Sequence, residues 1–341
     1  MNQELKGPGK LLDSNGALAQ RGWAKQLVLQ YDAADIQANR LRIKEWDYYI
    51  VLNAEGRYGL ATVIADNRYM GLATCTFFDY ENGKQVDFLV PKIFPMGKLG
   101  MPPDSAAGDI CCSDRHCILN YTLEPRGRHL YGRYTKSLLH GEIEFDIFLS
   151  QPPMDTMVIA TPWAEKATAF YYNQKINCMR AEGYVKIGGK TYNFSPEKDF
   201  GTLDWGRGVW TYDNTWYWGS GSALVDGIPF GFNIGCGFGD TSAASENMLF
   251  YDGVCHKLDR LHFEIPKGSY LKPWRFVTND GRFDMDFVPV YDNRTHISLG
   301  ILSQNAHQVF GKLHGKAILD NGTALDIQDM FCFAEQVRNR Y

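Results

Sequence analysis

The residues best suited to chemistry in this chain are concentrated between Asp204 and Trp218, where it reads DWGRGVWTYDNTWYW. These fifteen positions hold four tryptophans, two tyrosines, two aspartates and one arginine. Tryptophan faces stabilise cations, and burial disfavours the charged form of a carboxyl group and so raises its pKa. The segment therefore indicates an environment in which the pKa of a carboxyl group can be shifted and a developing cation can be stabilised.

Side chains alternate between the two faces of an extended chain, which limits the side chains that can share a site. Three of the tryptophans have the same parity and would project to one face: Trp210, Trp216 and Trp218. Trp205 has the opposite parity. We expect all four to converge with Asp204, Arg207 and either Glu182 or Glu246 on one concave pocket, because embedded charges usually have a partner or a purpose. In the alternative, Asp204 and Arg207 form a salt bridge at the rim of a β core.

Acidic residues near the tryptophans are the candidate catalytic groups. Asp204 is the first candidate acid, and Asp199, Glu182 and Glu246 are carboxyl groups that could share its proton or orient water. A guanidinium next to Asp204 would instead keep that aspartate ionised. The role of Asp204 therefore depends on whether it pairs with Arg207.

Candidates for substrate contact come from the aromatic segment and from the glycine-rich stretch GFNIGCGFGD at 231–240. Its glycines permit the close approach of a ligand or of another backbone segment. Lys175 follows two tyrosines in FYYNQKIN and could lie over an aromatic ring or hold a polar group of a ligand. The predicted substrate-binding residues are Lys175, Trp205, Arg207, Trp210, Trp216, Trp218, Asn233, Asn247 and His256.

Motifs of the common cofactor-dependent and nucleophilic enzymes are missing from the sequence. It has no GxSxG, HExxH, P-loop or CxxC pattern, and GCGFGD lacks the following helix that a phosphate-binding loop needs. In CCSDRHC, strand alternation separates Cys112, Asp114 and His116 from Cys111 and Cys117, so the candidate metal ligands are divided. We expect no metal, no cofactor and reduced cysteines.

Charge and hydropathy exclude several partners. The 341 residues include 35 basic and 39 acidic side chains, for a net charge of -4, and no dense basic run occurs. Nucleic acids and anionic membranes are therefore not expected partners. The N-terminal MNQELKGPGK has no apolar run and no segment has the length of a membrane span, so we expect a cytoplasmic protein without an integral membrane segment.

Composition and periodicity predict an all-β fold. Aromatic residues make up 14% of the chain, 34 residues are glycine, and turn pairs such as DNG and NDG recur. Alternation with period two is clear in IEFDIFL and FDMDFVPV. Only residues 24–46 have a pattern that could hold a short helix.

The two halves of the chain resemble one another. Trp46-Asp47-Tyr48 and Trp216-Tyr217-Trp218 begin similar stretches 170 residues apart, close to half the chain length. This echo predicts two tandem β-barrel domains, residues 1–175 and 176–341, each large enough to hold one small ligand. Chance matching in a chain rich in glycine and aromatic residues is the alternative.

Longer stretches carry a resemblance to a known family. They are KINCMRAEGYVKIGGKTYNF, DFGTLDWGRGVWTYDNTWYWGSGSA and GFNIGCGFGDTSAASENMLFYDGVCHKL, together with GWAKQ and the terminal DM-F-F-AE pattern. The chain resembles the family of domain of unknown function 2804 over nearly its whole length. It is more distantly similar to two-barrel, lipocalin-like proteins of the calycin group: carotenoid hydratase, AttH proteins, Diels–Alderases and tocopherol cyclase. The resemblance implies two lipocalin-like antiparallel β-barrels and chemistry without a metal or organic cofactor.

The sequence is compatible with two functions. The first is a cofactor-independent hydratase (a hydro-lyase), isomerase or cyclase that acts on a small hydrophobic molecule by carboxylic-acid catalysis. The second is a non-catalytic, lipocalin-like binding protein in which Arg207 or Lys175 contacts the polar head of a hydrophobic ligand. Catalysis needs a carboxyl or imidazole group in the pocket without a fixed basic partner, whereas binding does not. Carboxylates beside tryptophans also suit sugar hydrolysis, which depends on the distance between two carboxyl groups.

Overall fold

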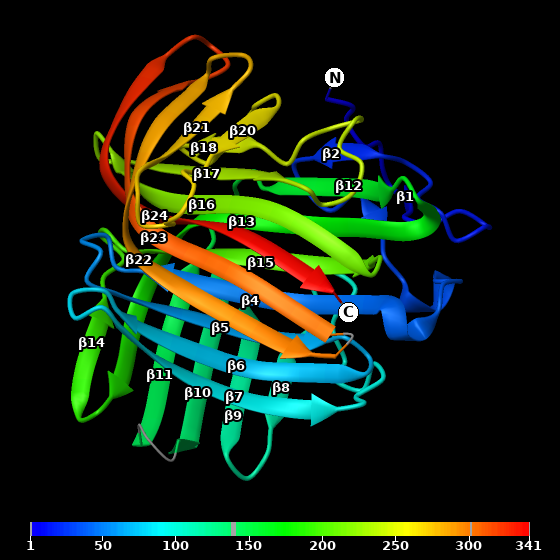
Figure 1. Ribbon diagram of the computed structural model, residues 1–341, viewed down its shortest axis with the longest axis horizontal. Coiled ribbons are helices and arrows are strands. Elements are labelled where there is room, and N and C mark those ends of the chain that lie inside the picture. The colour runs from blue at the N-terminus through cyan, green and yellow to red at the C-terminus, as the bar shows by residue number, and fades with distance from the viewer. Residues whose placement is uncertain (1, 138–140, 301, 341) are drawn as a thin grey trace.

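The computed structural model describes residues 2–137, 141–300 and 302–340, and within these the chain consists mainly of β-strands (Figure 1). One antiparallel sheet has thirteen strands and another has nine. Each sheet curls into a half-barrel. A small parallel pair, β1 (Gly9–Lys10) and β3 (Leu29–Gln30), lies outside them. The predicted all-β, two-barrel fold is confirmed.

The thirteen-stranded sheet contains β2 (Gly22–Ala24), β4 (Ile43–Leu52), β5 (Tyr58–Asp66), β6 (Met70–Asp79), β7 (Lys84–Ile93), β8 (Ile110–Ser113), β9 (Cys117–Glu124), β10 (Gly127–Ser137), β11 (Gly141–Ser150), β12 (Met157–Trp163), β13 (Lys166–Ile187), β14 (Lys190–Phe194) and β15 (Phe200–Val209). The nine-stranded sheet contains β16 (Asp213–Val225), β17 (Ile228–Cys236), β18 (Met248–Tyr251), β19 (Val254–Lys257), β20 (Leu261–Glu264), β21 (Trp274–Thr278), β22 (Phe283–Leu299), β23 (Leu302–Ile318) and β24 (Ala324–Arg340).

The two sheets share a strand order. In each, a four-strand meander begins with a strand that also pairs with the last strand of the sheet: β4 pairs with β15, and β16 pairs with β24. Trp46 and Trp216 are each the fourth residue of these first strands, as the internal echo predicts. One sheet ends at Val209 and the next begins at Asp213, whereas residue 175 lies inside β13. The domain division near residue 175 stays a prediction.

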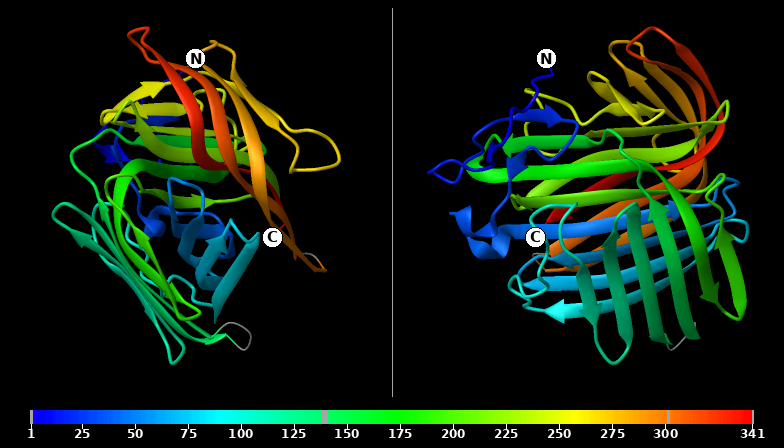
Figure 2. Two further views of the ribbon diagram at one scale, coloured as in Figure 1. Left: turned by 90° about the vertical axis from the view of Figure 1, so that its left-hand side faces the viewer. Right: turned by 180° about the vertical axis from the view of Figure 1, so that it is seen from behind.

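The sheets pack against each other through a shared hydrophobic core. Phe78 of β6 and Tyr80 in the turn after it contact Phe310 of β23, and Tyr80 also contacts Phe331 of β24. Figure 2 shows β22, β23 and β24 running from the top of the molecule down across the strands β4 to β6. A second core cluster lies within the nine-stranded sheet, around Trp274 and Phe276.

Strand β15 lies between these layers, and all ten of its residues are buried. Its even-numbered residues face the second sheet and its odd-numbered residues face the interior of the first, as strand alternation requires. Residues 170–180 of β13 pair with β15, and the register shifts between Ile176 and Met179. Cys178 at this irregularity has a φ of 60°. Together, β13 and β15 position the candidate site.

The helical expectation at residues 24–46 is met only by two short 3-10 turns, Ala33–Asp35 and Arg40–Arg42. Asp32 and Asn39 cap them by accepting hydrogen bonds from the backbone N–H groups of Ala34 and Leu41. None of the helices in the described part of the chain has the length and apolar character of a membrane span.

Candidate functional site

A buried ion pair lies where β13 and β15 face the second sheet. Register places Lys175 opposite Asp204, and Nζ of Lys175 lies 2.7 Å from Oδ1 of Asp204. The two atoms lie at ion-pair distance, but the Nζ atom of Lys175 makes no well-directed hydrogen bond with any of the described residues. Asn173, two residues before Lys175, donates to Asp204 Oδ1 at 2.6 Å and to the carbonyl of Trp205 at 2.7 Å.

The second sheet places aromatic rings over this ion pair. Nζ of Lys175 lies 4.0 Å from the ring centroid of Trp218 and 5.9 Å from that of Phe238. Trp218 in turn donates from Nε1 to Asn233 Oδ1 at 2.7 Å. The ammonium group is thus held by one carboxylate and by the faces of aromatic rings, which stabilise cations.

Glu246 contributes a second carboxyl group and is 2% exposed. Its backbone carbonyl and Oε2 accept from Asn233 Nδ2 at 2.9 and 3.4 Å. A Cβ atom at Gly235 would lie 2.4 Å from Glu246 Oε1, so this glycine makes room for the carboxyl group. Burial raises the pKa of Glu246 to about 7, with the positive charge of Lys175 opposing the shift and the negative charge of Asp204 adding to it.

Glu335 on β24 contributes a third carboxyl group. Its Oε1 accepts from Trp216 Nε1 at 2.9 Å, and its Oε2 accepts from Gln308 Nε2 at 3.4 Å. Gln308 also donates to the hydroxyl of Tyr48 at 3.2 Å. Burial raises the pKa of Glu335 to about 7, opposed by the Trp216 hydrogen bond and Lys175, and increased by Asp204. Neither glutamate forms an ion pair within the described part of the chain.

We call Lys175, Asp204, Glu246 and Glu335, with the amides and indoles that contact them, the interface cluster. Lys175 and Glu246 are almost fully buried, whereas the side chain of Asp204 retains 12% exposure and Glu335 is partly exposed. The cluster is therefore accessible to solvent at its Asp204 and Glu335 side.

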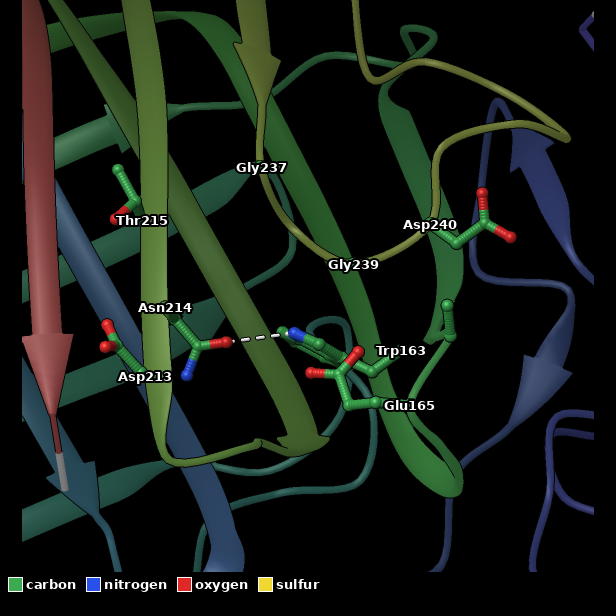
Figure 3. Close-up of a pocket in the computed structure, with 9 residues that line it drawn as sticks. Trp163, Glu165, Asp213, Asn214, Thr215, Gly237, Gly239 and Asp240 are labelled. Carbon is green, nitrogen blue, oxygen red and sulfur yellow. Dashed lines mark hydrogen bonds between the residues drawn. The ribbon is translucent and has the colours of Figure 1, made fainter.

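A surface pocket of about 390 Å³ lies outside the cluster (Figure 3). Trp163 donates to Asn214 Oδ1 at 2.9 Å across this pocket. Gly237 and Gly239 also line it, and the residue between them, Phe238, packs inward against Tyr171 with ring centroids 4.8 Å apart. Phe238 thus connects the pocket wall with the aromatic rings around Lys175.

Arg207 and Trp205 lie on the opposite face of β15. Every guanidinium nitrogen of Arg207 donates a hydrogen bond, and Nη2 contacts Asp47 Oδ1 at 2.9 Å. The guanidinium carbon lies 4.3 Å from the ring centroid of Trp205. Asp204 therefore pairs with Lys175 and not with Arg207. The predicted convergence on one pocket is wrong for Trp205 and Arg207, because strand alternation separates odd from even positions.

The other predicted residues divide between the cluster and its surroundings. Lys175, Asp204, Glu246, Asn233, Trp216 and Trp218 lie together, and Trp210 contacts Trp216 at a centroid distance of 5.3 Å. Asn247 stabilises β17, because its Oδ1 atom accepts a hydrogen bond from the backbone N–H of Gly235 at 2.8 Å.

Three predicted residues lie elsewhere. Glu182 is exposed on the far half of β13. Asp199 accepts from the backbone N–H groups of Ala54 and Ser195 and so holds a loop in place. His256 lies near the surface, where Nδ1 accepts from the backbone N–H of Asp320 at 3.2 Å.

The sequence analysis missed Glu335, Gln308 and Asn173. Asn173 has the same parity as Lys175 on one strand, so alternation could have identified it. Glu335 lies within the terminal DM-F-F-AE pattern that contributed to the family resemblance. Its position beside Trp216 depends on the pairing of β24 with β16, which a single sequence does not reveal.

The CCSDRHC segment lies at the other end of the molecule, in the hairpin of β8 and β9. Asp114 accepts from the backbone N–H groups of His116 and Cys117 and pairs with Lys92 at 2.9 Å. Cys111 is exposed, whereas Cys112 and Cys117 are buried. The aspartate thus stabilises a turn. The eight cysteines are free thiols in the structure.

The interface cluster holds two carboxyl groups whose pKa values are suited to proton transfer near neutral pH. Glu246 and Glu335 each have a pKa raised to about 7, so near neutral pH either group can act as an acid or as a base. Lys175 adds a fixed positive charge, and the tryptophan faces can stabilise a developing cation. These properties need only side chains of this chain.

Known structures share this fold at low sequence identity. A putative AttH from Nitrosomonas europaea aligns with a TM-score of 0.54 and 13% identity, covering 90% of this chain and 96% of that one. Kievitone hydratase from Nectria haematococca aligns with a TM-score of 0.51 and 11% identity, covering 98% of each chain. CghA solved with Sch210972 gives a lower TM-score of 0.42 at 8% identity, over 88% of this chain and 89% of that one.

The first two of these structures share the two-barrel fold of this chain, and they are named as a putative AttH and as kievitone hydratase. None of the curated proteins compared matches the sequence. A family model matches residues 2–341, which is nearly the complete sequence. The chain therefore belongs to the family described as domain of unknown function, DUF2804.

Proposed function

We propose that the interface cluster is the active site of a cofactor-independent enzyme that adds water to, or rearranges, a small and largely apolar substrate. The observation that carries this proposal is the pair of carboxyl groups, Glu246 and Glu335, that lack a fixed basic partner among the described residues and have pKa values of about 7. A general acid or base works best when its pKa is close to the pH at which it operates.

In this proposal Asp204 is not the acid. Its Oδ1 atom lies against the Lys175 ammonium and accepts a hydrogen bond from Asn173, so the atom already serves as an acceptor within the protein. The role of Asp204 is to balance the charge of Lys175 and to raise the pKa of both glutamates by repulsion, in addition to the larger effect of burial.

The hydration step balances in protons and bonds. One protonated glutamate donates its proton to an alkene carbon, and the carbocation forms against the Trp216 and Trp218 rings. The other glutamate, as carboxylate, takes a proton from the water molecule whose oxygen bonds to the cation. The net reaction converts an alkene and water into an alcohol, and one proton has moved from the first glutamate to the second. If the carboxylate glutamate instead takes a proton from a carbon next to the cation, an alkene forms again and the product is an isomer.

The two solved neighbours with TM-scores above 0.5 support the fold needed for such a site, and kievitone hydratase is named as a hydratase. Their low identity limits that support to the fold. The alternative is a lipocalin-like binding protein, which is favoured by the fixed Lys175–Asp204 pair. A stable ion pair beside aromatic rings can hold a ligand without any chemistry.

Solvent isotope incorporation distinguishes these functions. The purified protein is incubated with a panel of prenylated phenols and linear polyenes in D₂O containing ¹⁸O-labelled water, and products are analysed by mass spectrometry. We expect one panel member to gain a labelled water molecule or a solvent deuterium. Glu246→Gln and Glu335→Gln should each lower that rate by about 10²- to 10⁴-fold, while Glu182→Gln, an exposed carboxyl on the same strand as Lys175, should not.

The binding-protein alternative gains if a panel member binds but carries no solvent label. It also gains if the Glu246→Gln and Glu335→Gln variants keep the full rate of any labelling observed.

A further inference from the structure

Three polar side chains of β13 face the interface cluster with hydrogen-bonding capacity that the described residues do not use. Tyr171, Asn173 and Lys175 alternate along the strand and so share one face. All three are 0% exposed. The Tyr171 hydroxyl, the Asn173 Oδ1 atom and the Lys175 Nζ atom have no hydrogen-bond partner within the described ranges.

Buried polar atoms are almost always hydrogen-bonded, because an unpaired one costs about 1–3 kcal/mol. Three of them on one strand face, beside the same carboxyl groups, are therefore unusual. The Asn173 amide is oriented by its own bonds, since Nδ2 donates to two acceptors, Asp204 Oδ1 and the Trp205 carbonyl. Its Oδ1 atom is consequently fixed as a free acceptor.

Tyr171 is held rigidly in this position. Its ring is stacked between Phe238, at 4.8 Å and 11°, and Trp46, at 6.1 Å and 20°. A Cβ atom at Gly206 would lie 2.1 Å from the Trp46 ring, so this glycine is what allows Trp46 to lie across β15. Burial raises the pKa of Tyr171, with smaller contributions from Glu246, Asp204 and Glu335, so the hydroxyl keeps its proton and remains a donor.

The free atoms comprise two donors and one acceptor. Tyr171 and Lys175 offer hydrogens to an electron-rich oxygen, and both border the ring of Phe238. Asn173, between them on the strand, offers an acceptor for a hydrogen. A hydroxyl group matches both needs because it donates one hydrogen and accepts through two lone pairs, whereas a hydrocarbon matches neither and a carbonyl or ether matches only the donors.

We propose that the ligand of this site is an apolar molecule that carries a phenolic or enolic hydroxyl group, bound by Tyr171 and Asn173 next to the Lys175 ammonium. The aromatic rings of Trp46, Phe238 and Trp218 lie against Tyr171 and Lys175 and provide apolar contacts next to these polar groups. This inference takes the location of the site from the proposed function and specifies its substrate class. It makes Tyr171 a substrate-binding residue.

The test compares the binding of matched probes by isothermal titration calorimetry, supported by quenching of tryptophan fluorescence. The probes are 2-naphthol, naphthalene and 2-methoxynaphthalene, which share one ring system and differ in the hydroxyl group. We expect the wild-type protein to bind 2-naphthol about tenfold more tightly than either other probe, since a hydrogen bond to a buried partner adds roughly that factor.

Variants connect the preference to the named side chains. Tyr171→Phe and Lys175→Met should each remove most of the tenfold preference for 2-naphthol while naphthalene affinity changes little. The matched control is Tyr172→Phe on the same strand. The Tyr172 hydroxyl faces the other way and donates to the Leu29 carbonyl at 2.9 Å, so its loss should leave the preference intact.

Three results overturn the inference. They are equal affinity for 2-naphthol and naphthalene, equal affinity for 2-naphthol and 2-methoxynaphthalene, and no binding of any probe to the folded protein. If the protein prefers 2-naphthol but no substrate gains solvent label, this inference stands and the proposed catalysis fails. If a substrate without a hydroxyl group gains solvent label and the protein shows no preference for 2-naphthol, the proposed catalysis stands and this inference fails.

Discussion

Strand β15 carries two buried ion pairs on its two faces, and they differ in how fully their polar atoms are satisfied. On the inner face, Arg207 donates from every guanidinium nitrogen, to Asp47 and to backbone carbonyls such as that of Pro102. On the interface face, Lys175 contacts Asp204 without further hydrogen bonds from the described residues, and two more carboxyl groups lie nearby.

This difference distinguishes a pair that stabilises the fold from a pair that we propose contacts a ligand. A network in which every donor has an acceptor fixes the positions of strands and gains nothing from a ligand. A cluster with free donors, a free acceptor and repelling carboxyl groups is costly in the protein alone and is improved by a proton or a ligand. The four predictions below test this comparison, from the largest expected effect to the smallest.

Breaking the inner pair should have the largest effect. Arg207→Met leaves Asp47, which is 4% exposed, without its cationic partner and leaves carbonyl groups unpaired. Such losses cost about 3–5 kcal/mol. Urea unfolding should show this decrease in the free energy of unfolding. Lys175→Met is the matched comparison and should cost less, because Asp204 keeps its Asn173 hydrogen bond and partial exposure. A larger loss for Lys175→Met than for Arg207→Met would reverse the comparison.

The next effect concerns pH. The pKa of Glu246 is raised from 4.5 to about 7 by burial, so the folded chain holds this proton over a range in which the unfolded chain has lost it. The stabilisation that this proton gives to the folded chain is complete below pH 4.5 and is lost as the pH rises through about 7. The free energy of unfolding should therefore fall between pH 5 and pH 8, by up to about 3 kcal/mol from this group. In Glu246→Gln the fall should be smaller by that amount. An identical pH dependence in both proteins would show that Glu246 does not titrate in this range.

Neutralising the interface aspartate should have a modest effect. Asp204→Asn removes the counter-charge of Lys175 but also relieves repulsion with Glu246 and Glu335. We expect a loss of about 1 kcal/mol in the free energy of unfolding, and a lower pKa for both glutamates, since one source of their elevation is gone. A loss as large as that of Arg207→Met would assign Asp204 a mainly structural role.

The smallest effect is expected at His256. This side chain lies outside the cluster and accepts one hydrogen bond from the backbone of Asp320. His256→Gln should change the free energy of unfolding by less than about 1 kcal/mol and leave ligand binding unchanged. A loss of 2-naphthol binding in His256→Gln would extend the site beyond the two sheets' interface.

Much of the fold follows from local patterns in the sequence. Alternation, glycine turns and the echo between Trp46 and Trp216 indicate two β units with a common strand order, because side-chain periodicity is set by the backbone itself. The same periodicity also excludes a pair between Asp204 and Arg207, because positions 204 and 207 differ in parity and project to opposite faces of a regular strand. Proximity in sequence suggested a pair that the strand geometry forbids.

The composition of the interface cluster was less predictable, because it depends on pairings between distant segments. Lys175 meets Asp204 through the register of β13 and β15, which shifts near Cys178. Glu335 reaches Trp216 from a strand more than a hundred residues further along the chain. Carboxyl and amine side chains at such distances carry no local signal that they share a site.

The proposed chemistry depends most on two glutamates of the interface cluster that gain and lose protons near neutral pH. Carbon-13 NMR of protein labelled at the glutamate carboxyl carbon measures this directly, with Glu246→Gln and Glu335→Gln to assign the signals. We predict two carboxyl resonances that titrate with apparent pKa values of about 7, one of them missing in each variant. Titration of every glutamate below about pH 5.5, close to the ordinary range of this side chain, would contradict the claim.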